Sequence, residues 1–100
     1  MYKDITRQTI YDLPKAELHV HLEGTLEPEM IEALARKYKV EVPDSVLALR
    51  APFDLDRFFK AYTDAVSLMR ESQDFAEALS AYLSKAKEQG VLYAEVMVDM

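Results

Sequence analysis

The two histidines of this chain lie two residues apart, in the stretch 17-ELHVHLEGTLEPE-29, at a spacing that suits metal binding. On an extended strand, residues i and i+2 share a face with Cα atoms about 6.5–7 Å apart, so His19 and His21 would project side by side. Two such imidazoles can bind one cation of the zinc type, at roughly 2.0–2.1 Å from each nitrogen. A helix would direct the same two side chains to different sides, so this chemistry requires a strand.

The alternative is the water-facing side of an edge strand, where polar alternation has no chemical role. Acidic residues at Glu17 and Glu23 are predicted on the face that carries the histidines, and four ionisable side chains on one face favour a site. A catalytic zinc ion usually has three protein ligands and a water, so the pair by itself is incomplete. Glu17, Glu23 and Asp99 are candidate partners by residue type.

Two strands and three helices are predicted to position these side chains. Alternating apolar residues predict a strand over 17–23 that ends at Gly24, with Leu18, Val20 and Leu22 on its second face. Apolar spacing and breakers then predict helices over 28–38, 55–70 and 74–89, an irregular segment over 40–52 and a buried strand over 91–100. The third helix is predicted to begin with an Asp74–Glu77 capping box and to end before Gly90.

This order of elements indicates a parallel sheet of the α/β class, because parallel strands require a helical crossover. Two strands cannot form a stable parallel sheet by themselves, so we expect the chain to be the opening part of a larger α/β protein.

Composition excludes several classes of function. The net charge is −6 and the isoelectric point is near 4.8, with no clustered basic face, so nucleic-acid binding is not expected. The absence of cysteine excludes disulfides, cysteine-ligated metals and thiol catalysis. No apolar run reaches the roughly 18 residues of a membrane span and the first residues are polar, so a cytoplasmic protein is expected.

The run 13-LPKAELHVHLEGTLEPE-29 resembles the start of the adenosine and adenine deaminase family, within the metal-dependent amidohydrolase superfamily. The similarity continues through 53-FDLDRFFKAY-62, 72-SQDF-75 and 90-GVLYAEVMVD-99, in order, over nearly the whole chain. It implies a (β/α)₈ TIM barrel of about 250 residues or more, with the active site at the carboxyl ends of the strands. Residues 1–100 would then be the amino-terminal part of one metallohydrolase domain, with its first two strands and the intervening helices.

The resemblance also assigns roles to individual residues. It implies that His19 and His21 bind zinc. The implied substrate contacts are an acid on the ribose side, a glycine, an apolar helix that gates the purine pocket and an acid after the second strand: Glu23, Gly24, Leu55, Phe58, Phe59, Tyr62 and Asp99. The aromatic residues alone would be read as ordinary helix core. The remaining ligands and the acid–base glutamate are expected beyond Met100, so the 100-residue chain alone is expected to be inactive.

The implied reaction is zinc-dependent hydrolytic deamination of a 6-aminopurine, with adenosine as the first choice and adenine or aminofutalosine as the alternative. Many adenosine deaminases of this family have Asp where this chain has Glu23, whereas adenine and aminofutalosine members often have Glu. Adenine-type members tend to follow the matching Asp with Pro, but Met100 follows Asp99 here. The other readings are a different H-x-H metallohydrolase and a non-catalytic metal-binding or assembly module.

Overall fold

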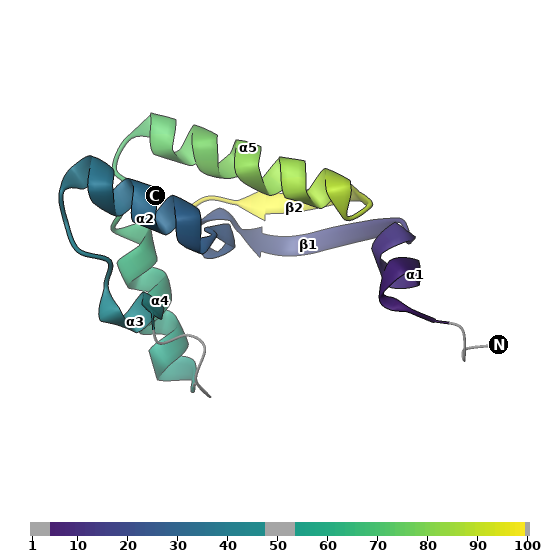
Figure 1. The fold of residues 1–100 in the computed structure, drawn as a ribbon, viewed down its shortest axis with the longest axis horizontal. Coiled ribbons are helices and arrows are strands. Elements are labelled where there is room, and N and C mark those ends of the chain that lie inside the picture. The colour runs from purple at the N-terminus through teal and green to yellow at the C-terminus, as the bar shows by residue number, and fades with distance from the viewer. Residues whose placement is uncertain (1–4, 48–53, 100) are drawn as a thin grey trace.

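The computed structural model describes residues 5–47 and 54–99. Its elements, in chain order, are α1 (Arg7–Asp12), β1 (Lys15–His21), the 3₁₀ helix η1 (Leu22–Thr25), α2 (Pro28–Tyr38), α3 (Asp44–Leu47), α4 (Leu55–Val66), α5 (Ser72–Glu88) and β2 (Val91–Met97). The two strands pair in parallel, as the sequence predicted. Helix α5 runs along one face of the strand pair, and α2 and α4 gather at its carboxyl end (Figure 1).

A bulge at His19 interrupts the regular alternation of β1. Glu17 pairs with Ala94 and Val20 pairs with Val96, so three steps on β1 face two on β2. His19 lies in the bulge and has a positive φ of 61°, in the left-handed region that few residues other than glycine adopt. One extra residue reverses the phase of the side chains on either side of it.

The prediction that one face carries Glu17 together with both histidines is therefore wrong for Glu17. Its carboxylate turns toward α5 and accepts a hydrogen bond of 2.9 Å from the Tyr82 hydroxyl. Leu18, which was predicted on the opposite face from the histidines, lines the same hollow as His19. The alternation fails because the bulge depends on pairing with a strand more than 70 residues away in sequence.

The buried core lies around the turn that follows β1. It is built from η1, α2, the connection after α4, and α5: Leu22, Ile31, Leu34, Leu68, Met69 and Ala78. Because Leu22 directly follows His21, burial of Leu22 fixes the end of the strand that carries the histidines.

Several predicted boundaries change in the structure. Strand β1 ends at His21, since residues 22–25 turn into η1 to bury Leu22, so Glu23 is not on the strand. Helix α4 ends at Val66 rather than 70, and the segment predicted to be irregular contains α3. Residues 48–52 of that segment and Met100 lie outside the described residues. Helix α1 was not anticipated; the Thr6 side chain accepts a hydrogen bond from the N–H of Thr9 at its start.

The third predicted helix, α5, also begins earlier than predicted, at Ser72. Asp74 lies in its first turn and accepts the N–H groups of Arg70 and Glu71, so the predicted Asp74–Glu77 capping box is wrong. A carboxylate in this position satisfies N–H groups that have no partner within the helix. The helix ends before Gly90, whose φ of 78° confirms the predicted stop.

Strand β2 is less buried than its apolar sequence predicted. Leu92 is 80% exposed, because α5 covers only part of the strand and the described residues include no third strand beside it. Within the described part of the chain, no helix combines the length and the hydropathy needed to cross a membrane.

Candidate functional site

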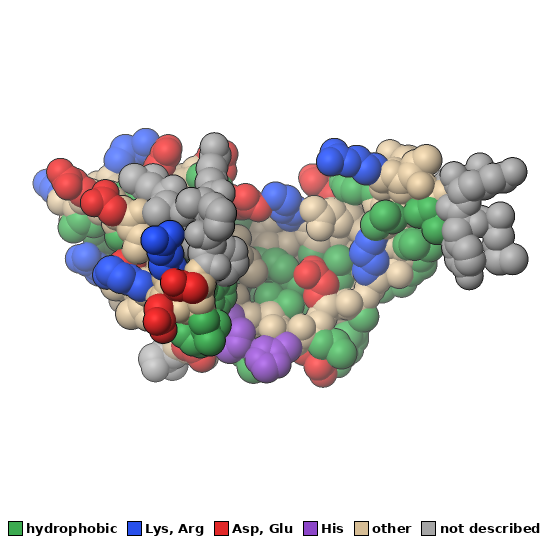
Figure 2. All heavy atoms as spheres, turned by 90° about the horizontal axis from the view of Figure 1, so that it is seen from below, with side chains coloured by type: hydrophobic (Ala, Val, Ile, Leu, Met, Phe, Trp, Pro, Cys, Tyr) green, Lys and Arg blue, Asp and Glu red, His purple; other side chains and the backbone are tan. Residues whose placement is uncertain are grey.

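The two histidine side chains lie next to each other at the carboxyl end of β1. Their ring centroids are 5.1 Å apart and the planes are inclined by 48°. Figure 2 shows the two side chains together at the edge of a hollow in this face of the molecule. The bulge at His19 and the start of η1 after His21 together produce this arrangement. The structure therefore brings the predicted metal pair together, as its spacing suggested.

A network of two carboxylates and one phenol adjoins His21. Asp99 Oδ2 lies 3.4 Å from His21 Nδ1. The Tyr62 hydroxyl lies 2.5 Å from Asp99 Oδ2 and 3.2 Å from Glu23 Oε2. The backbone N–H of Asp99 donates a hydrogen bond of 2.7 Å to Glu23 Oε1. The segment after β1, helix α4 and the segment after β2 thus meet beside the histidines.

The electrostatics of this network keep its phenol neutral and its exposed acid ionised. Burial, reinforced by the carboxylates of Asp99 and Glu23, raises the pKa of Tyr62 well above its usual range. The hydrogen bond from the Tyr62 hydroxyl lowers the pKa of Asp99. At neutral pH, Asp99 is therefore an anion beside His21, and Tyr62 supplies a hydroxyl proton to hold it.

A pocket of about 460 Å³ opens in front of these groups. Its lining comes from β1, η1, α4 and the segment after β2: Val20, His21, Gly24, Thr25, Phe58, Phe59, Tyr62 and Asp99. The Phe58 ring lies nearly parallel to the Tyr62 ring, at an interplanar angle of 23°, with centroids 6.4 Å apart. Aromatic walls combined with a few polar groups at one end are typical of sites for flat heterocycles.

Two of the predicted substrate contacts lie outside this lining. Leu55 is 66% exposed at the start of α4, and Glu23 is only 1% exposed. The roles of the predicted contacts that do line the pocket stay predictions. Val20 and Thr25 also line the pocket, and no role was predicted for either of them. The one sequence signal for Thr25 was its position directly after the predicted contact Gly24. Val20 had no such signal, because it was predicted on the strand face opposite to the histidines.

The donors present fit part of a metal site. His21 Nδ1 is buried, and its one polar neighbour among the described residues is Asp99 Oδ2, at 3.4 Å and without good hydrogen-bond geometry. Such an atom is unusual unless it serves a ligand, and here a second imidazole and a carboxylate lie beside it. Within residues 5–47 and 54–99, no group of three or more metal-binding side chains forms a cluster. The two histidines would supply only part of a zinc site, which requires further ligands to be complete.

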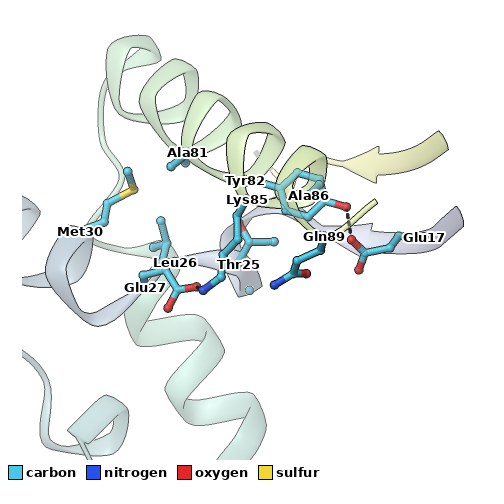
Figure 3. A pocket seen from close by; sticks show the side chains of 12 residues that line it. Glu17, Thr25, Leu26, Glu27, Met30, Ala81, Tyr82, Lys85, Ala86 and Gln89 are labelled. Atoms are coloured by element: carbon cyan, nitrogen blue, oxygen red, sulfur yellow. Dashed lines mark hydrogen bonds and ion pairs between the residues drawn. The ribbon is translucent and has the colours of Figure 1, made fainter. Parts of the chain in front are cut away.

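A second pocket, of about 390 Å³, lies between α5, η1 and the beginning of α2 (Figure 3). Tyr82 and Glu17 meet at one side of it, and Lys85 forms an ion pair with Glu27 at its rim. Its lining includes no histidine, although it shares Gly24 and Thr25 with the first pocket. The Tyr82–Glu17 pair is useful as a control, because it is a second acid–tyrosine pair and neither residue lines the first pocket.

Parallel strands whose carboxyl ends carry the polar groups define an α/β protein with a candidate site at the strand ends. Comparison with known proteins is specific about the family. The profile described as adenosine deaminase matches residues 14–100. The chain belongs to this family, which confirms the resemblance read from its motifs.

Individual relatives agree with that assignment. An adenine deaminase of Ectopseudomonas mendocina is 44% identical over 91 residues, which are 87% of this chain and 29% of the relative. An adenine deaminase of Rhodospirillum rubrum is 42% identical over 94 residues, with shares of 90% and 28%. The crystal structure of an adenine deaminase from Arthrobacter aurescens superposes with a TM-score of 0.74 at 37% identity, over 86% of this chain and 28% of that one. The chain thus spans less than a third of the length of these relatives.

Proposed function

We propose that this chain supplies two metal ligands and one wall of the substrate pocket of a hydrolytic 6-aminopurine deaminase that acts on adenine. The observation that carries the proposal is the meeting of the histidine pair, Asp99 and the Phe58–Tyr62 stack at one pocket, in a chain of the deaminase family.

Two observations favour adenine over adenosine, which the sequence placed first. The relatives compared above are all named adenine deaminase. In addition, the acid expected to contact a ribose, Glu23, is buried, with Oε1 accepting the Asp99 N–H and Oε2 facing the Tyr62 hydroxyl at 3.2 Å. A base without a sugar requires no such contact.

In the proposed reaction, the oxygen of water adds at C6 of the purine and the amino group leaves as ammonia. The parallel Phe58 and Tyr62 rings pack against the flat base, and ionised Asp99 accepts a hydrogen bond from a purine N–H. The Tyr62 hydroxyl keeps Asp99 oriented, and the aromatic wall excludes bulk water. Bound by His19, His21 and further ligands, a zinc ion would supply Lewis-acid activation of water.

The test uses the full-length gene product, purified with its metal. Zinc content is measured by elemental analysis, and ammonia release is measured with adenine and with adenosine. We expect about one zinc per active site and a kcat/KM for adenine at least about tenfold above that for adenosine. A preference for adenosine would overturn the substrate assignment. Absence of ammonia from either substrate, with zinc bound, would overturn the deaminase proposal.

A pair of variants separates the site from the fold. His21→Asn is expected to lose zinc and ammonia release together, because the amide is a poor replacement for imidazole at zinc. Tyr82→Phe, which removes the bond to Glu17 outside the histidine pocket, is expected to keep both. Equal loss in the two variants would show that the effect comes from general destabilisation.

A further inference from the structure

Glu23 is the unusual buried acid of this site. Its side chain is 1% exposed, comparable only to Asp74 among the buried charged residues of the described chain. Asp74 has an ion-pair partner in Lys37. Glu23 has none among the described residues: one oxygen accepts a backbone N–H, and the other lies 3.2 Å from a phenol hydroxyl that it shares with Asp99. Burial of a carboxylate without a cation lowers stability, so its presence calls for a role.

The two partners of Glu23 are both walls of the pocket. Oε1 accepts the N–H of Asp99, and Oε2 lies 3.2 Å from the Tyr62 hydroxyl. These residues are 76 and 39 positions away in sequence, so one side chain links the segment after β2 to helix α4. Asp99 and Tyr62 line the pocket, whereas Glu23 does not.

We propose that Glu23 is a positioning residue, which ties Tyr62 and Asp99 to the strand that carries the metal pair and so sets the shape of the purine pocket. A ligand in this pocket touches Tyr62 and Asp99, and Glu23 acts on it only through them. This inference rests on the proposed function, and it gives the buried acid a role different from the ribose contact implied by family resemblance.

The length of the side chain matters more than its charge in this role. Glu23→Gln keeps the length, since its amide oxygen can accept the Asp99 N–H and its amide nitrogen can donate to the Tyr62 oxygen. Glu23→Ala removes both links. Removing a residue that supports a metal ligand without touching the metal typically costs about 10- to 100-fold in affinity or activity, and we expect a similar cost for a residue that supports the pocket wall. We expect Glu23→Ala to lower kcat/KM for adenine by about that factor, mainly through KM, and Glu23→Gln to recover most of it.

The experiment combines kinetics and crystallography on full-length, metal-loaded protein. Glu23→Ala is made alone and together with Tyr62→Phe, and its cost is compared in the two backgrounds. Because Glu23 acts through the Tyr62 hydroxyl, the cost is expected to shrink several-fold once that hydroxyl is absent. Glu17→Ala is the matched control: it breaks a second acid–tyrosine pair, whose acid lies on β1 and outside the pocket, and should leave KM for adenine unchanged.

Crystal structures of the variants test the positioning independently of the substrate. In Glu23→Ala, the Tyr62 hydroxyl and Asp99 Oδ2, which are 2.5 Å apart, are expected to separate. In Glu23→Gln they are expected to stay in place. If Tyr62 and Asp99 stay in place in Glu23→Ala, or if the kinetic costs are fully additive, the proposal is overturned. Should Glu23→Ala not fold, an equally inactive Glu23→Gln with an unchanged pocket would overturn it too. Failure of the wild type to deaminate adenine would refute the proposed function, while the crystallographic comparison would still decide the positioning.

Discussion

The replacement Asp74→Ala tests how α2 and α5 are held together beneath the site. The Asp74 carboxylate is buried and accepts hydrogen bonds from Lys37 Nζ at 2.7 Å and from the Tyr38 hydroxyl. It also accepts the backbone N–H groups of Arg70 and Glu71, at 2.9 and 3.0 Å. One side chain therefore joins the end of α2 to the start of α5.

The expected cost follows from the groups that lose this acceptor. Each of the two backbone N–H groups left without a partner costs about 1–3 kcal/mol, less where water can reach it. The Lys37 ammonium is 40% exposed and regains water, so it adds little. We expect Asp74→Ala to lower the free energy of unfolding by about 2–4 kcal/mol. Glu27→Ala breaks an ion pair whose side chains are 54% and 50% exposed, and should cost less than about 1 kcal/mol.

Equilibrium unfolding of the full-length protein in urea measures both variants, with the free-energy change taken from the shift in midpoint at an unchanged m-value. Equal small costs for Asp74→Ala and Glu27→Ala would refute this reasoning, because the buried and exposed carboxylates would then be equivalent. The loss of stability at acidic pH provides a second check. Burial opposes ionisation of Asp74, but its hydrogen bonds from Lys37 and Tyr38 still hold its pKa below the usual range. Its contribution is thus present above about pH 4 and is lost as the pH falls through the folded pKa; Asp74→Asn should remove that part of the acid dependence.

Three further predictions concern the fold. Gly90→Ala should cost about 1–3 kcal/mol in the same urea assay, because Gly90 has a φ of 78° and its new Cβ would lie 2.8 Å from the Leu13 carbonyl oxygen; an unchanged midpoint would contradict this. Burial, reinforced by the bond to Glu17, raises the pKa of Tyr82 to about 12, so its contribution to stability is complete below pH 10 and is lost between about pH 10 and 12. Tyr82→Phe should therefore show a shallower alkaline loss of stability than the wild type, and identical slopes would count against the pairing. The isolated 100-residue polypeptide should associate or unfold in part, since it exposes large apolar side chains, of which Leu92 is 80% exposed. A sharp thermal transition of a monomer, independent of protein concentration, would argue against this.

Local pattern was sufficient for much of the fold. Helix α2 has the predicted bounds of 28–38, because Pro28 suits the first turn and apolar residues recur at helical spacing. The parallel pairing of the two strands also followed from the helices between them. Boundaries were less predictable: residues 67–71 have helical composition but turn between α4 and α5, where Leu68 and Met69 enter the core.

The sequence by itself determined that two imidazoles would lie together at the end of a strand, since this requires only the i, i+2 geometry of extended backbone and a polar turn after it. The tertiary structure decided which groups surround them. Pairing with β2 places a bulge at His19 and turns Glu17 away from the site. Packing of η1 buries Glu23, and so allows it to join Tyr62 and Asp99 across 39 and 76 residues. Sequence periodicity records the local preference of the backbone, whereas these contacts depend on how distant elements pack, which no local spacing encodes.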